Sequence, residues 1–152
     1  MQVLNEPSAL YGMQNATTDR VWHNFEPETS SIYLQRLNVF SDKIARLLQQ
    51  LNGFRELLPD WDSYNAEAPS KKAINAAMRF IIECHHLALP FYFTSPGVDG
   101  EVMLEFQKGV KSAELYFLPD ASTELVLFQE DEFVFEGHLP DHFDKMIQFF
   151  KD

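Results

Sequence analysis

The hydrophobic pattern of the chain changes period at Pro90. Before this proline, apolar residues recur every three or four positions, which is the spacing of amphipathic helices. The pattern predicts a long helix over about 31–58 with Thr29 to Ser31 as candidate N-caps, and a second helix from the N-cap Ser70 to about Leu87. A break is expected near Gly53, because glycine costs about 1 kcal/mol relative to alanine inside a helix.

After Pro90, apolar and polar residues alternate in short runs, which is the pattern of half-buried strands. The runs are Phe91 to Thr94, Glu101 to Gln107, Ser112 to Leu118, Glu124 to Gln129 and Glu132 to Glu136. The links between them are short enough for hairpins, so an antiparallel meander of about five strands is expected.

Pro140 suits the first position of a closing helix, whose apolar face is formed by Phe143, Met146, Ile147 and Phe150. The predicted fold is therefore α+β, a two-layer sandwich in which two N-terminal helices and a C-terminal helix cover one face of the sheet. Residues 30–152 are expected to form the single domain. Residues 1–29 are expected to be a mostly irregular arm whose Trp22 and Phe25 pack on the core or on a partner.

Composition narrows the class of protein. The single Cys84 cannot form an internal disulfide, which favours a reducing, cytoplasmic setting. No apolar run approaches the roughly 20 residues of a membrane-spanning helix. The formal net charge of −11 opposes contact with phosphate backbones and anionic membranes, so direct nucleic-acid and membrane binding are not expected.

The densest group of candidate functional side chains is Asp60, Trp61, Asp62 and Tyr64, in a turn-rich loop between the two predicted helices. One interpretation makes Trp61, Asp62 and Tyr64 a binding site, with carboxylates beside an aromatic platform. The other makes the loop an architectural clasp, in which Trp61 fills a gap near Asp99-Gly100 and the aspartates bind loop amides.

Two further clusters are candidates. Asp60, Asp62, Glu101 and Glu105 would form a catalytic carboxylate cluster if the fold brings them together. Glu130, Asp131 and Glu132 form a compact negative group at a predicted hairpin tip, which would attract a basic protein.

No residue spacing predicts a cofactor or a metal. Adjacent histidines such as His85 and His86 point to different sides of a helix, and His138 and His142 are separated by Pro140 and lack the helical glutamate of a two-histidine zinc motif. Cys84 has no evident activating base and is expected to be a small structural residue.

The chain contains the pattern Trp61-Asp62-x-Tyr64-x-Ala66-x-x-Pro69-Ser70, followed by a predicted helix and then by Asp99-Gly100 and Leu104-Glu105-Phe106. With this pattern, the segment from Leu58 to Leu118 resembles a group of uncharacterised small proteins from bacteria and phages. The group often has glycine at the position of Asn65 and tryptophan at that of Phe106; asparagine also tolerates left-handed backbone. The resemblance implies the fold and the joint importance of both segments, and it brings no established activity.

Three functions follow as hypotheses. The first is a non-enzymatic acidic domain that binds a basic protein, of the immunity, antitoxin or inhibitor kind. The second is a small hydrolase or nucleotide-handling enzyme built on the carboxylate cluster. The third is an acidic mimic of DNA, which would compete with nucleic acid for a basic protein.

Overall fold

The computed structural model describes residues 40–151, which form three α-helices, a short 3-10 helix and one sheet. The elements in chain order are α3 (Asp42–Gly53), η2 (Phe54–Glu56), α4 (Lys71–Cys84), β1 (Phe91–Pro96), β2 (Val102–Lys108), β3 (Lys111–Phe117), β4 (Thr123–Gln129), β5 (Glu132–Gly137) and α5 (Phe143–Phe149). The sheet runs β1-β2-β3-β4-β5 with every neighbouring pair antiparallel, so the predicted five-strand meander is confirmed.

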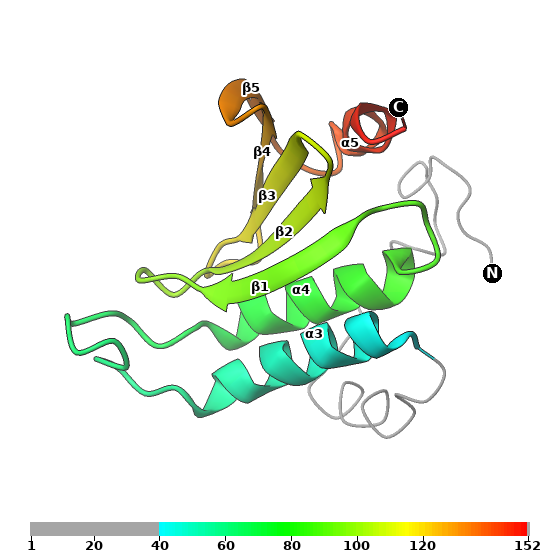
Figure 1. Ribbon diagram of the computed structural model, residues 1–152. Helices are drawn as coiled ribbons and strands as arrows, with labels where there is room; N and C mark the ends of the chain where they lie inside the picture. The colour runs from blue at the N-terminus through cyan, green and yellow to red at the C-terminus, as the bar shows by residue number, and fades with distance from the viewer. Residues whose placement is uncertain (1–39, 152) are drawn as a thin grey trace.

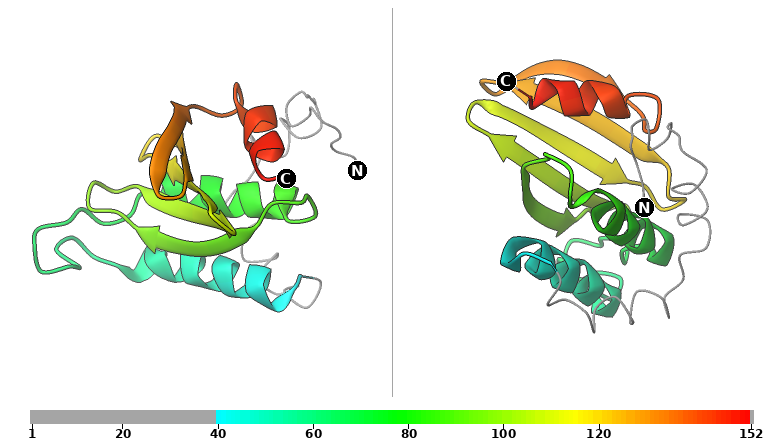
Figure 2. Two further views of the ribbon diagram at one scale, coloured as in Figure 1. Left: turned by 45° about the horizontal axis from the view of Figure 1, so that its top comes forward. Right: turned by 90° about the vertical axis from the view of Figure 1, so that its right-hand side faces the viewer.

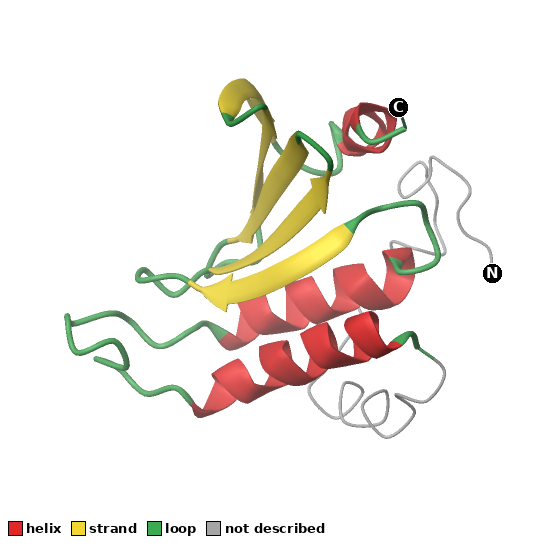
Figure 3. Cartoon of the chain, viewed as in Figure 1, coloured by secondary structure: helices red, strands yellow, loops and turns green. Residues whose placement is uncertain are grey.

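The helices cover one face of this sheet, here called the inner face (Figures 1 and 3). Helix α4 packs against β2 and β3, and α3 lies beside α4 and against β1. Helix α5 lies on the inner side of the opposite half of the sheet, where Phe150 contacts Phe106 (Figure 2). The chain thus forms the predicted α+β sandwich, with an open sheet.

Phe80 on α4 is the centre of the core. Its ring lies 6.0–6.3 Å, centroid to centroid, from those of Phe91, Phe106, Phe117 and Phe143. These rings come from three strands and from α5, so one fully buried side chain joins both layers. Large aromatic rings bury the most apolar surface per residue, which explains how this domain uses its many phenylalanines.

The start of the first predicted helix is wrong. Ser41 has extended backbone and its Oγ accepts a hydrogen bond from the Ile44 amide, so α3 begins after it rather than running continuously from about residue 31. A serine that caps the backbone amides competes with helix continuation. At the other end, the helix changes to 3-10 geometry after Gly53, where the break was expected. The predicted arm over 1–29 and the part of the first predicted helix before residue 40 lie outside the described residues.

The start of the closing helix is also wrong. Pro140 follows a cis peptide bond and lies in a turn, and α5 begins only at Phe143. Its apolar face is as predicted, since Phe143, Met146 and Phe150 are buried. The second predicted helix ends at Cys84 rather than near Leu87, and Ser70 is its N-cap as predicted.

Candidate functional site

The loop between η2 and α4, residues 57–70, is built around two aspartates. The Asp62 carboxylate accepts hydrogen bonds from the amides of Tyr64 at 2.8 Å and Ala66 at 3.1 Å. The Asp60 carboxylate accepts one from the Asn65 amide at 2.7 Å. Carboxylates that bind amides a few residues ahead are the usual means of stabilising a tight turn. Both aspartates therefore hold the shape of the loop.

The loop needs this support because its backbone is unusual. Asp60, Ser63 and Asn65 all have positive φ, at 69°, 67° and 71°. Side chains other than glycine disfavour this region, and asparagine and aspartate tolerate it best. Asn65 therefore adopts the left-handed backbone that its side chain permits.

The returning half of the loop is joined to the sheet. The Trp61 indole N–H donates to the Glu67 carbonyl at 2.9 Å, and the Glu67 amide donates to the Val98 carbonyl at 2.9 Å. Glu67 and Asp99 form a parallel bridge, and the Ser70 amide donates to the Gly100 carbonyl. These contacts place the Trp61 loop against the β1–β2 turn, where the clasp interpretation expected it, although Trp61 is only half-buried.

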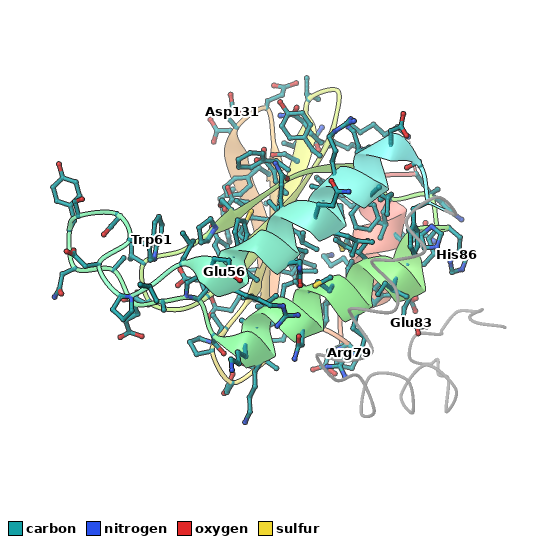
Figure 4. All side chains as sticks on the ribbon, turned by 90° about the horizontal axis from the view of Figure 1, so that it is seen from below. Glu56, Trp61, Arg79, Glu83, His86 and Asp131 are labelled. Carbon is teal, nitrogen blue, oxygen red and sulfur yellow. The ribbon has the colours of Figure 1, made fainter. Side chains whose placement is uncertain are left out.

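The tip of the same loop is open to solvent. Tyr64 is 88% exposed, the most exposed of the large hydrophobic side chains in the described part of the chain. Figure 4 places Trp61 on this loop, which projects from the body of the domain, and places Asp131 well away from it. The loop thus combines a structural half with an exposed tip.

The four residues of the predicted carboxylate cluster occupy three different settings. Asp60 and Asp62 bind loop amides, and the Glu101 carboxylate accepts from the Asp99 amide at 2.9 Å and lies over Gly97. Any Cβ at Gly97 would lie 2.2 Å from that carboxylate. Glu105 lies in the middle of β2 and faces Glu114 of β3. Three of the four carboxylates are thus held by backbone amides within turns.

The predicted acidic tip, Glu130 to Glu132, is the β4–β5 turn. Glu130 and Asp131 have positive φ and all three side chains are exposed. The Glu130 amide donates to the Val110 carbonyl, so this tip lies beside the β2–β3 turn, at the end of the sheet opposite the β1–β2 turn. The structure therefore does not bring the acidic tip and the Trp61 loop together.

The sheet has a second face, here called the outer face, which no helix in the described range 40–151 covers. Strand alternation assigns residues to it by their buried neighbours. They are Phe93, Ser95, Met103, Glu105, Gln107, Ser112, Glu114, Tyr116, Glu124, Val126, Phe128, Phe133 and Glu136. The face is therefore a mixture of apolar side chains and carboxylates, with neither lysine nor arginine.

The carboxylates of the outer face lie close together. Glu105 is directly opposite Glu114, and Tyr116 is directly opposite Glu124. The Tyr116 hydroxyl donates to Glu114 at 2.5 Å. Partial burial, and then the Glu114 charge, raises the pKa of Glu105. Partial burial also raises the pKa of Tyr116, with the hydrogen bond to Glu114 adding to the effect. Like charges opposite each other in a sheet are destabilising, so this arrangement costs free energy in the isolated protein.

The strand lysines point to the other face. Lys108 Nζ donates to the Phe150 carbonyl at 2.8 Å, and Lys111 Nζ donates to the Phe149 carbonyl at 2.9 Å. Both ammonium groups thus satisfy carbonyls at the C-terminal end of α5, where cations are favoured. This use of the lysines leaves the negative charge of the outer face uncompensated.

The sequence interpretation identified Glu105 but missed the outer face as a unit. The signal was present, because Glu105, Glu114, Glu124 and Glu136 all fall on the polar phase of their strands. The two strand pairs that join these side chains into one surface become clear only with the register.

The remaining titratable groups of residues 40–151 form no site for a metal. Within residues 40–151, no group of three or more histidine, cysteine, aspartate or glutamate side chains has the geometry to hold a metal ion. Burial, and then Glu83, raises the pKa of the Cys84 thiol, which opposes formation of a nucleophilic thiolate. The His85 ring packs edge-on against Phe40, with centroids 4.7 Å apart.

Among the described residues, no helix has the length and apolar character that crossing a membrane requires. No protein-family model matches the chain, and the comparisons with curated proteins and with solved structures likewise give no match.

Proposed function

We propose that this protein is a cytoplasmic, non-enzymatic domain that binds a basic protein through the outer face of its sheet, as an immunity, antitoxin or inhibitor protein would. The observation that carries the proposal is the Glu105–Glu114 pair, two carboxylates held opposite each other on a face without basic side chains. A cationic partner would relieve the repulsion between them. Places where a fold accepts an unfavourable local arrangement are often functional.

The apolar residues of the same face support a protein partner. Phe93 and Phe133 are exposed, and Met103, Val126 and Phe128 are partly exposed. Binding surfaces combine apolar and aromatic contacts with a polar surround, whereas a surface made only for solubility has little use for aromatic rings. The mixture favours a partner that presents both basic and apolar side chains.

No comparable observation supports either of the two alternative functions, a carboxylate-based enzyme or a DNA mimic. For a carboxylate-based enzyme, Asp60, Asp62 and Glu101 would have to act while bound to backbone amides. For a DNA mimic, the carboxylates would be expected without the aromatic side chains among them. The target of a mimic is itself a basic protein, so the experiment below also detects that case.

The test is affinity capture of the tagged protein from the cells that make it, at low salt, where electrostatic attraction is strongest. The outer-face variant combines Glu105→Gln, Glu114→Gln and Glu124→Gln. A matched control removes the same charge from exposed positions elsewhere, with Glu56→Gln, Asp141→Asn and Asp144→Asn.

The expected result is one basic protein that the wild type and the control variant capture in equal amounts. The outer-face variant should capture at least about tenfold less of it, which is the loss expected when a few charge pairs with the partner are removed. Equal recovery by all three proteins, or the absence of any partner specific to the wild type, would contradict the proposal. Circular dichroism of each variant establishes that the fold is retained.

A further inference from the structure

Strand β5 forms one border of the sheet and, among the described strands, pairs only with β4. Within the described chain, residues 132–137 make no backbone hydrogen bond beyond that pair. In an antiparallel edge strand, every second residue directs its N–H and C=O away from the sheet. β5 therefore presents a row of backbone donors and acceptors to solvent, which is the template for another strand.

The side chains of β5 leave this edge accessible. Phe133 is 62% exposed and Val134 is 48% exposed, at a bulge where the register shifts. Phe135 points to the inner face, where it contacts the His142 ring and the Lys145 ammonium of α5. Helix α5 thus lies beside β5 on the inner face, as Figure 2 also shows, and no element of residues 40–151 pairs with the outer edge of β5.

The charges along β5 determine which kind of strand can pair with its free edge. Glu130, Asp131 and Glu132 lie at the start of β5 and Glu136 near its end, with no basic residue in the strand. A second copy of β5 would bring these carboxylates against each other, and like charges across a strand pair are unfavourable. A strand rich in lysine or arginine would be attracted by the same carboxylates.

The register further defines the incoming strand. Glu136 ends the row that contains Val126, Glu114 and Glu105, and Phe133 ends the row that contains Phe128. A sixth strand would continue these rows on the outer face, with a basic residue beside Glu136 and an apolar residue beside Phe133. Cross-strand neighbours of this kind are the units that stabilise sheets.

We propose that β5 accepts an extended segment of basic and apolar residues as a sixth strand. The inference rests on the proposed function and specifies how the partner is held. An outer face of five strands, about six residues each, covers only about 400–500 Å² at about 4.8 Å between strands and 3.3 Å per residue. That is less than the roughly 800 Å² per partner of a standard interface, so contacts at the edge would extend the surface.

The probe is a ten-residue peptide that alternates pairs of lysine and valine (Lys-Lys-Val-Val repeated), so that each face of the strand carries both residue types. Both of its ends are blocked. Binding is measured by titration, and amide hydrogen exchange is followed residue by residue in β5. One control peptide has the same composition as a block of lysines followed by a block of valines. A second carries a methyl group on every backbone nitrogen, which keeps the charges and removes the donors of a strand.

The expected result is slower exchange of those amides of residues 132–137 that face away from β4, with binding at least about tenfold tighter than for either control peptide. Unchanged exchange in β5, equal binding of the methylated peptide, or no binding of the alternating peptide would overturn the inference.

Two protein variants separate this inference from the proposed function. Glu132→Gln with Glu136→Gln removes charge at the edge, and Glu105→Gln with Glu114→Gln removes the same charge from the centre of the outer face. We expect the edge variant to weaken peptide binding about tenfold and the central variant to weaken it less than about threefold. The reverse order would overturn strand addition, whereas the capture experiment decides the proposed function by itself.

Discussion

Trp61 shows how one side chain contributes to both the structure and the surface of this protein. Its indole N–H binds the Glu67 carbonyl, and the Glu67 amide binds the Val98 carbonyl. This chain of contacts connects the loop tip to the sheet. Because Trp61 is only half-buried, it contributes less burial than a core tryptophan would.

We expect Trp61→Ala to lower the free energy of unfolding by about 1–3 kcal/mol, below the 3–5 kcal/mol typical of a fully buried large aromatic residue. Trp61→Phe keeps most of the ring and loses the donor, so it should cost about 0.5–1.5 kcal/mol. Urea unfolding measures both values, and faster exchange of the Glu67 amide should accompany them. If Trp61→Ala left the urea midpoint and this exchange unchanged, Trp61 would not hold the loop to the sheet.

At the scale of elements, α5 is a short helix that depends on its surroundings. It has seven residues, too few to be stable alone, and no side chain caps its N-terminus. Its C-terminal end is held by Lys108 and Lys111, which bind the carbonyls of Phe150 and Phe149. The strands that carry the outer face therefore also hold the helix on the inner face.

Replacing Lys111 by methionine should lower the free energy of unfolding by about 1–2 kcal/mol, since a charged hydrogen bond to a helix C-terminus is lost while the aliphatic stem is kept. Lys71→Met is the matched control, because Lys71 is exposed at the N-terminal end of α4. It should change stability by less than about 0.5 kcal/mol. Chemical denaturation tests the pair, and equal effects of the two substitutions would show that the contact with α5 contributes nothing.

The sequence predicted the strands better than the ends of the helices. Alternation is a local signal, and each of the five predicted strands lies within two residues of the observed one. The start of α3 depends on whether Ser41 caps or continues a helix, and the start of α5 depends on the turn at Pro140. Thr29, Ser30, Ser31 and Ser41 are all residue types that cap helices, so the local pattern does not select among them. The turn before α5 depends on a distant residue, because the Leu139 amide donates to the Thr123 hydroxyl.

The outer face was only partly predictable from the sequence. The link Lys108-Gly109-Val110-Lys111 was correctly expected to be a hairpin, and Lys108 does pair with Lys111. Counting back three residues along each strand from that pair would have placed Glu105 opposite Glu114. The predicted meander also implies that the fifth strand is an edge, and the structure adds that no other element of residues 40–151 pairs with it.

At the scale of the whole molecule, the distribution of charge makes stability depend on pH. Burial raises the pKa of Glu83, on α4, to about 7, with Arg79 acting in the opposite direction. The folded state therefore binds a proton at Glu83 more tightly than the unfolded state does. The resulting stabilisation is complete below the ordinary glutamate pKa of about 4.3 and is lost as the pH rises through about 7.

Other groups also make stability depend on pH, and their effects must be separated from that of Glu83. Burial lowers the pKa of His85 and His86, so these residues destabilise the fold as the pH falls below about 6.5. Hydrogen bonds from Ser122 lower the pKa of Asp120, and that stabilisation is lost only below the ordinary aspartate range. The pH profile of the wild type alone is therefore a sum of opposing terms.

The difference in free energy of unfolding between the wild type and Glu83→Gln isolates the contribution of Glu83, because glutamine cannot ionise. Between pH 4.5 and pH 7.5, we expect the free energy of unfolding of the wild type to fall by about 1–2 kcal/mol relative to that of the variant. This is less than the whole pKa shift of Glu83 would give, because Glu83 is partly exposed to solvent. Urea unfolding at several pH values measures the difference, with Glu56→Gln as a control at an exposed site. A difference that stays constant with pH, or one that grows in favour of the wild type, would mean that Glu83 ionises normally in the folded protein. The expected slope would instead show that α4 holds a carboxyl group in a setting that favours its neutral form.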